Sequence, residues 1–94
     1  MLVQITKEHI KYGRPGKARS CALALALDSL GFKEVVVNAG NIGIGLLTKD
    51  NKDMWFCVGS SLNVWISSFD SGKKVLPIKV LFDFEHEKAE IVDD

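Results

Sequence analysis

The sequence predicts an α+β domain in which a mainly antiparallel sheet of about five strands carries two main helices on one face. Several segments alternate apolar and polar residues with a period of two, and two longer segments repeat apolar residues with helical spacing. In chain order the predicted elements run β-α-α-β-β-β-α-β. Because ninety-four residues leave no room for a second core, we expect a single domain over residues 1–94.

The first twelve residues predict a short strand followed by a short helix. Leu2–Ile5 form the expected strand. Thr6 is suited to cap a helix of one or two turns over Lys7–Tyr12, because its hydroxyl can accept a hydrogen bond from a free backbone N–H. Gly13 would end this helix, and we expect Gly13–Gly16 to form a loop.

Residues 22–27, ALALAL, have the period of a strand but the composition of a helix. Alanine and leucine are strong helix formers, and the segment has no β-branched residue. Gly31 is well placed just beyond the end of this helix. No charge interrupts the segment between Ser20 and Leu27, so more than one face of the helix is apolar. We expect the sheet to cover one face and a second helix or another subunit to cover the other.

Three strands are predicted after this helix. Glu34–Asn38 is rich in β-branched residues, and a turn cluster follows at residues 38–41. Ile42–Leu47 alternates with a period of two. A polar loop over residues 49–53 then joins it to a partner strand at Met54–Val58, as in a hairpin.

The second main helix and the last strand are predicted in the C-terminal third. Ser60 or Ser61 is the expected N-cap of the helix, and Gly72 lies beyond its end. The last strand alternates from Leu76 to Phe84, with Pro77 near its start. The chain from Glu85 onward is acidic, and we expect it to be solvated. The apolar stripe of the helix consists of Leu62, Trp65, Ile66 and Phe69.

Composition excludes several classes of protein. Twelve Lys and Arg residues balance twelve Asp and Glu residues, which does not suit a protein that coats nucleic acid. No apolar run reaches the length of a membrane span, and no signal peptide is recognisable. Cys21 and Cys57 each lie in an apolar segment, so we expect buried, reduced thiols in a cytoplasmic protein.

The sequence contains no pattern typical of a catalytic or metal centre. His9 lies beside Glu8 in the short helix, where a surface or capping role is expected, and His86 lies in the charged C-terminal segment. No Gly-x-Ser-x-Gly, HExxH or paired-cysteine motif is present. We therefore expect a non-enzyme without a metal or other cofactor.

The best candidate binding site is the basic loop before the ALALAL helix. Arg14, Lys17 and Arg19 supply positive charge, and arginine can grip a phosphate with two hydrogen bonds. Ser20 offers a hydroxyl donor, and Tyr12 offers a ring on which a base can stack. The free N–H groups of the helix start would favour an anion, whereas cations there oppose the helix dipole unless an anion is bound. The alternative is a solvated loop that binds nothing.

The two tryptophans are expected to play different roles. Trp65 lies on the apolar stripe of the second helix, which indicates core packing. Trp55 is out of phase with its apolar neighbours, so we expect it on the other face of the sheet. Gly43 and Gly45 on the adjacent strand would leave room there for a ligand or a partner backbone, or else mark a bulge.

Three segments resemble a set of small phage and prophage proteins. ITKEHI at residues 5–10 matches their opening "IT-x-EHI", CALALAL at 21–27 matches "C-P-V-A-L-A-L", and FDSGKKVLP at 69–77 matches "FD-x-G-x-x-V-x-P". The middle of the chain is unmatched. Many of these proteins carry a cysteine where this chain has Ala18, and a proline where it has Ala22. A metal or redox role for such a cysteine pair therefore does not carry over.

The resemblance implies an accessory protein that inhibits host defence in the host-cell cytoplasm. Combined with the basic loop, it predicts a homo-oligomer that binds a small phosphate-bearing ligand and sequesters it without turnover. A cyclic nucleotide immune signal, held as by an anti-CBASS sponge, is the expected ligand. The alternative is a protein-blocking inhibitor of the anti-CRISPR or antirestriction type. That inhibitor would use Trp55 with Glu85, Glu87 and Glu90. An enzyme that degrades a nucleotide is the third hypothesis.

Overall fold

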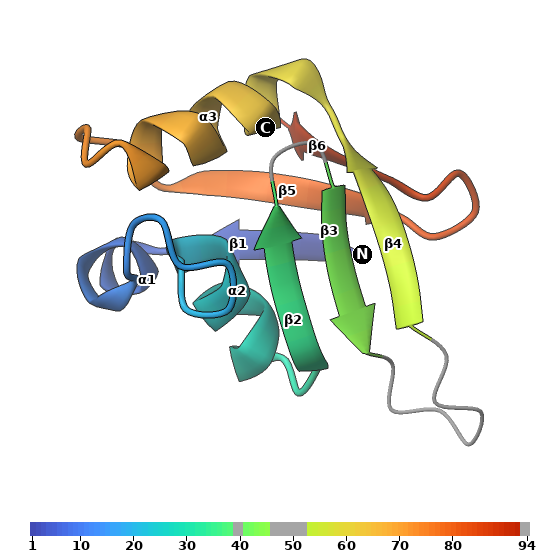
Figure 1. The fold of residues 1–94 in the computed structure, drawn as a ribbon. Coiled ribbons are helices and arrows are strands. Elements are labelled where there is room, and N and C mark those ends of the chain that lie inside the picture. Colours follow the sequence, from blue (N-terminus) through green and yellow to red (C-terminus); the bar gives the residue numbers. More distant parts are fainter. Residues whose placement is uncertain (39–40, 46–52, 93–94) are drawn as a thin grey trace.

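The computed structural model describes residues 1–38, 41–45 and 53–92, and within them the chain forms an α+β domain (Figure 1). The predicted fold class is confirmed. The turn at 39–40 and most of the loop at 49–53 lie outside the described residues, as do positions 46 and 47 of the third predicted strand. The elements are β1 (Leu2–Ile5), α1 (Lys7–Tyr12), α2 (Ala22–Ser29), β2 (Lys33–Asn38), β3 (Asn41–Gly45), β4 (Asp53–Val58), α3 (Ser60–Asp70), β5 (Ile78–Asp83) and β6 (Lys88–Val92).

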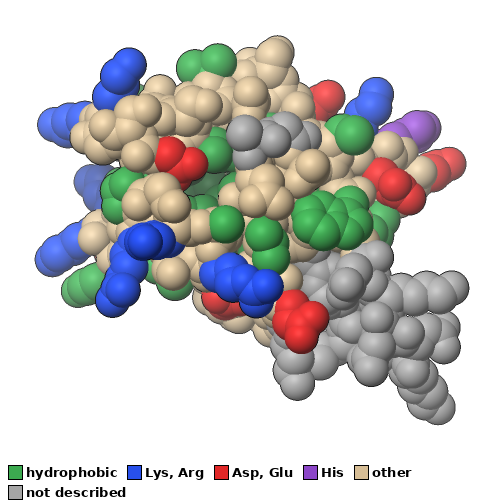
Figure 2. Space-filling model, in the orientation of Figure 1, with side chains coloured by type: hydrophobic (Ala, Val, Ile, Leu, Met, Phe, Trp, Pro, Cys, Tyr) green, Lys and Arg blue, Asp and Glu red, His purple; other side chains and the backbone are tan. Residues whose placement is uncertain are grey.

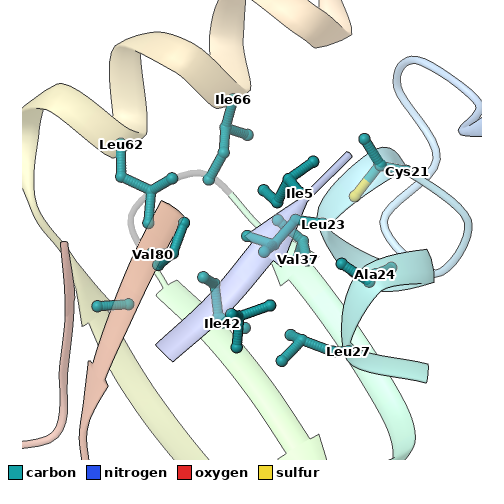
Figure 3. Close-up of a cluster of buried hydrophobic side chains, with 14 of the residues drawn as sticks. Ile5, Cys21, Leu23, Ala24, Leu27, Val37, Ile42, Leu62, Ile66 and Val80 are labelled. Carbon is teal, nitrogen blue, oxygen red and sulfur yellow. The ribbon is translucent and has the colours of Figure 1, made fainter. Parts of the chain in front are cut away.

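The six strands form one sheet in the order β1-β5-β6-β4-β3-β2. Neighbouring strands are antiparallel except β4 and β6, which run parallel. The sheet is curled, so both of its edge strands, β1 and β2, contact α2 (Figure 1). Figure 3 shows Ile5 and Val80 from one half of the sheet directed at the same core as Val37 and Ile42 from the other half. Helix α2 therefore closes the core between the two edges.

Strand β6 replaces the solvated tail that we expected after Glu85. It pairs with β5 from Asp83↔Lys88 to Lys79↔Val92. Ala89 is fully buried, and the N–H of Gly59 donates to its carbonyl (2.8 Å). The prediction was wrong because acidic residues on the outer face concealed a short period-two pattern in which Ala89 and Ile91 face inward.

Helix α1 has the predicted bounds and the predicted cap. The His9 N–H donates to Thr6 Oγ1 (3.4 Å), and the Thr6 N–H donates to His9 Nδ1 (3.0 Å). This reciprocal pair is a capping box in which histidine takes the place usually held by glutamate or glutamine. His9 is therefore a capping residue, as expected.

Helix α2 confirms the prediction for ALALAL, and both the sheet and another helix contact it. Its buried residues are all alanine or leucine, and they extend from its first residue to Leu27. Strands β1 and β2 contact this helix, and α1 contacts it as well. Gly13 packs so closely that a Cβ there would lie 2.5 Å from the backbone nitrogen of Ala22. We expected an oligomer because this apolar helix needed a second element to cover it. Helix α1 of the same chain contacts it, so this reason for expecting an oligomer no longer holds.

Helix α3 buries the predicted stripe of Leu62, Trp65, Ile66 and Phe69. Its N-cap is Gly59 rather than Ser60 or Ser61, because the hydrogen bond from Gly59 to strand β6 fixes the chain one residue earlier.

Trp65 is a core residue, as predicted. Its Nε1–H donates to the carbonyl of Leu76 (2.9 Å), and its ring is stacked on Phe69 with centroids 5.8 Å apart.

None of the helices in the described part of the chain has the length and apolarity that crossing a bilayer requires.

Candidate functional site

The basic loop before α2 is built from two consecutive turns. Pro15 and Gly16 occupy the centre of the first, where Gly16 has φ +75° and the Lys17 N–H donates to the Arg14 carbonyl (3.2 Å). Proline followed by a glycine of positive φ is the sequence of a type II turn. In the second turn the Ser20 N–H donates to the Lys17 carbonyl (3.1 Å). The Arg14 N–H donates to the Ser20 carbonyl (2.8 Å), which links the two turns. The loop therefore has a defined shape of its own.

Two hydrogen bonds fix this loop to distant parts of the chain. The Gly16 N–H donates to Oδ1 of Asp70, the last residue of α3 (3.0 Å). The Val37 N–H, on edge strand β2, donates to the carbonyl of Ala18 (2.8 Å). The loop is consequently held against the end of α3 on one side and against the sheet on the other.

The structure brings the predicted site residues together at one end of the molecule. Arg14, Lys17 and Arg19 are exposed, and Ser20 is half-buried. Lys73 and Lys74 are also exposed and come three and four residues after Asp70, the last residue of α3, which binds the loop. Figure 2 shows Lys and Arg side chains gathered here, over α1, the loop and the end of α3. We call Arg14, Lys17, Arg19, Lys73 and Lys74 the basic end.

Tyr12 borders the basic end and is 68% exposed. The Lys11 ammonium lies 5.5 Å from the centre of its ring, within the range of a cation–π contact. The Tyr12 ring is therefore accessible to solvent, and Lys11 adds a further positive charge beside it.

The start of α2 is not part of this surface, contrary to expectation. Its N-cap, Cys21, and the following Ala22, Leu23 and Ala24 are all buried. Burial raises the pKa of the Cys21 thiol above its ordinary value of 9.0, and the nearby charge of Asp70 raises it further. The helix amides are thus not presented to a ligand, and any anion must be bound by side chains and loop backbone.

Trp55 lies on the outer face of the sheet, as predicted, and is 48% exposed. Its partner in the β3–β4 register is Gly43. A Cβ at Gly43 would lie 2.8 Å from two atoms of the indole ring, so the ring rests directly on the glycine backbone. The room that we expected for a ligand or partner at Gly43 is filled by Trp55 itself.

The turn between β5 and β6 places acidic residues beside β4. Glu85 and Glu87 are exposed, and the Cys57 N–H donates to the Glu87 carbonyl (2.8 Å). Cys57 is two residues from Trp55 on the same strand and is exposed rather than buried, because strand alternation puts both on the outer face. Figure 2 shows hydrophobic side chains over β3 and β4 with acidic side chains next to them. Trp55, Glu85 and Glu87 are called the Trp55 face below. Glu90 instead lies against Gly59.

Asp83 organises this acidic turn. Its Oδ1 accepts the N–H groups of Glu85 (3.0 Å) and His86 (3.1 Å), and its Oδ2 lies 2.8 Å from His86 Nδ1. The hydrogen bonds from the His86 backbone and side chain are the main reason that the pKa of Asp83 is lowered from 3.8.

A pocket of about 470 Å³ lies elsewhere, where β1 and β6 end and α1 and β5 begin. None of the predicted site residues lines it. Sequence patterns missed the pocket because its walls come from residues near both ends of the chain, 4–8 with 77–79 and 91–92, which only the strand register brings together.

Within the described residues, no cluster of three or more His, Cys, Asp or Glu side chains is arranged to hold a metal ion. No family model, curated protein or solved structure matches this chain.

Replacing Gly43 with alanine should displace the Trp55 ring, because the new methyl group and the ring cannot occupy the same space. With 5-fluorotryptophan incorporated, the ¹⁹F resonance of Trp55 should shift, whereas that of Trp65, a core residue, should not. Unchanged resonances for both tryptophans would contradict the stacked arrangement.

We expect the pKa of the Asp83 carboxyl group to lie below 3.8 and that of the Asp28 carboxyl group to lie above it. Hydrogen bonds lower the pKa of Asp83, whereas partial burial raises that of Asp28. The contribution of Asp83 to stability should therefore be complete above pH 3.8 and be lost as the pH falls through its folded-state pKa. NMR titration of the side-chain carboxyl carbons measures both. Equal midpoints would contradict the described turn.

Proposed function

We propose that this protein binds a small phosphate-bearing ligand at the basic end and holds it without turnover. The observation that carries the proposal is the fixed loop, which exposes Arg14, Lys17 and Arg19 and is joined through Asp70 to the end of α3, after which come Lys73 and Lys74. Several cations on one surface attract an anion, and a bound anion would offset any repulsion between them. Asp70 neutralises only part of this charge.

A compact ligand fits this surface better than a long nucleic acid does. The whole chain carries no net charge, so its positive potential is local, whereas nucleic-acid coating depends on many phosphate contacts. Arginine side chains can hold phosphate oxygens with paired hydrogen bonds. The exposed ring of Tyr12 at the border supplies a surface for a base. A ligand that carries both phosphate groups and a base is a nucleotide.

The phage resemblance makes a cyclic nucleotide immune signal the specific ligand that we propose. Sequestration is favoured over turnover because His9, the histidine nearest to the loop in sequence, is committed to the α1 cap. In this proposal the protein acts in the cytoplasm of the host as a non-enzymatic sponge, without a cofactor.

A protein-blocking inhibitor is the second candidate, and the Trp55 face favours it. An exposed tryptophan held flat on a glycine is already ordered before it meets a partner, which limits the entropy lost on binding. Glu85 and Glu87 beside it would suit a basic partner surface. The first candidate uses the basic end and the second uses the Trp55 face, so substitutions in one surface can distinguish the two functions.

Isothermal titration calorimetry against cyclic di- and trinucleotides tests the leading proposal. Lys17→Ala should weaken binding about two- to fivefold, the range for one exposed ion pair. Lys88→Ala removes one exposed lysine from the start of β6 and should have no effect. Chromatography of the ligand after incubation should recover it unchanged.

Absence of heat with every cyclic nucleotide, or equal weakening by Lys17→Ala and Lys88→Ala, would contradict the leading proposal. Capture of one stoichiometric host protein that is lost in Trp55→Ala but retained in Lys17→Ala would support the protein-blocking function instead.

A further inference from the structure

An anionic group already binds the backbone of the basic loop, and it belongs to the protein itself. Asp70, the last residue of α3, accepts the Gly16 N–H at its Oδ1 (3.0 Å). Carboxylate and phosphate oxygens are alike as acceptors, because both carry negative charge and form charge-assisted hydrogen bonds with backbone N–H groups. The Asp70 carboxylate therefore marks a place on the loop where an anion can be held.

This contact is open to solvent. Gly16 and Asp70 are both exposed, and a Cβ added to Gly16 would meet no atom within 4 Å. A hydrogen bond in such a place contributes little net stability, because water competes for both of its partners. A second anion can therefore reach the Gly16 N–H without any buried group being opened.

The loop does not depend on Asp70 for its shape. Three backbone hydrogen bonds join Arg14, Lys17 and Ser20 to one another, and a fourth, from Val37, holds the loop to β2. The end of α3 is fixed separately, by the burial of the apolar stripe of the helix. Exchange of the Asp70 carboxylate for another anion would therefore leave both the loop and the helix in place.

The charges around this contact favour an exchange. Lys17 follows Gly16 directly, and Lys73 comes three residues after Asp70, so cations of the basic end flank both partners in sequence. A phosphate group drawn to these cations is repelled by the Asp70 carboxylate as long as that carboxylate stays at the loop. A phosphate group that replaces it gains the N–H donor and carries more negative charge toward the same cations.

We propose that Asp70 is an internal competitor at the basic end, and that a phosphate group of the ligand takes its place at the Gly16 N–H. Gly16 is then the backbone contact for the ligand, and Asp70 lowers the affinity for anions that cannot displace it. This inference rests on the proposed function, since both use the basic end, but it requires neither a base nor a cyclic ligand.

Pyrophosphate, which has phosphate groups but no base, is the probe for the test. In ¹H–¹⁵N NMR spectra the Gly16 amide resonance should move as pyrophosphate is added up to about 10 mM, where a ligand with a millimolar Kd is largely bound. Sodium chloride at the same ionic strength should not reproduce this movement. The Gly16 resonances of the unmodified protein and of Asp70→Ala should differ without pyrophosphate and coincide at saturation, because phosphate is then the acceptor in both.

Two substitutions of Asp70 separate competition from anchoring. Asp70→Ala removes the acceptor and its charge, whereas Asp70→Asn removes the charge and keeps an oxygen that can accept the Gly16 N–H. Both variants should bind pyrophosphate about two- to fivefold more tightly than the unmodified protein. Asp70→Asn remains informative if Asp70→Ala loosens the end of α3. Glu85→Gln, which removes one exposed carboxylate from the β5–β6 turn, should leave the Kd unchanged.

Weaker binding by Asp70→Ala than by the unmodified protein would overturn the proposal, because Asp70 would then assist binding by anchoring the loop. Gly16 resonances that still differ at saturation would overturn it too, since Asp70 would still hold the N–H. So would the absence of any pyrophosphate-induced shift in Asp70→Ala. If the resonances converge but no cyclic nucleotide gives heat, the exchange at Gly16 is supported and only the proposed nucleotide ligand is wrong.

Discussion

The burial of α2 between the two edges of the curled sheet is the constraint on which the rest of the structure depends. Strands β1 and β2 are the two edges of the sheet, and α2 contacts both of them. The first turn of α2 must be covered as well, and Gly13 does this by close backbone contact with Ala22. The basic loop is thus a direct consequence of how α2 is buried.

As a result, two surfaces at opposite ends of the molecule differ in charge. The loop that covers α2 places cations next to Asp70 and the lysines that follow α3. The β5–β6 turn places Glu85 and Glu87 beside Trp55. A chain without net charge therefore carries exposed cations at one end and exposed acidic residues at the other.

Local patterns predicted most elements, because helix composition, caps and period-two alternation act over a few residues. The bounds of β1 and α1, the helical state of ALALAL and the stripe of α3 are examples. Strand β6 was missed because its pairing with β5 depends on the turn that Asp83 stabilises. The exposure of the predicted cations is observed. The expectation that the start of α2 would offer free N–H groups to an anion was wrong, because Gly13 and α1 cover that end only in three dimensions. The pocket depends wholly on register.

The reactivity of the two thiols tests the burial of α2 most directly. Cys21 is the N-cap of α2 and is buried, whereas Cys57 is exposed on β4. With a thiol reagent under native conditions, Cys57 should react at once and Cys21 only as fast as the structure opens. In Gly13→Ala, where a methyl group would meet the backbone of Ala22, Cys21 should react faster. Comparable rates for both thiols in the unmodified protein would contradict the account, because the start of α2 would then be open to solvent.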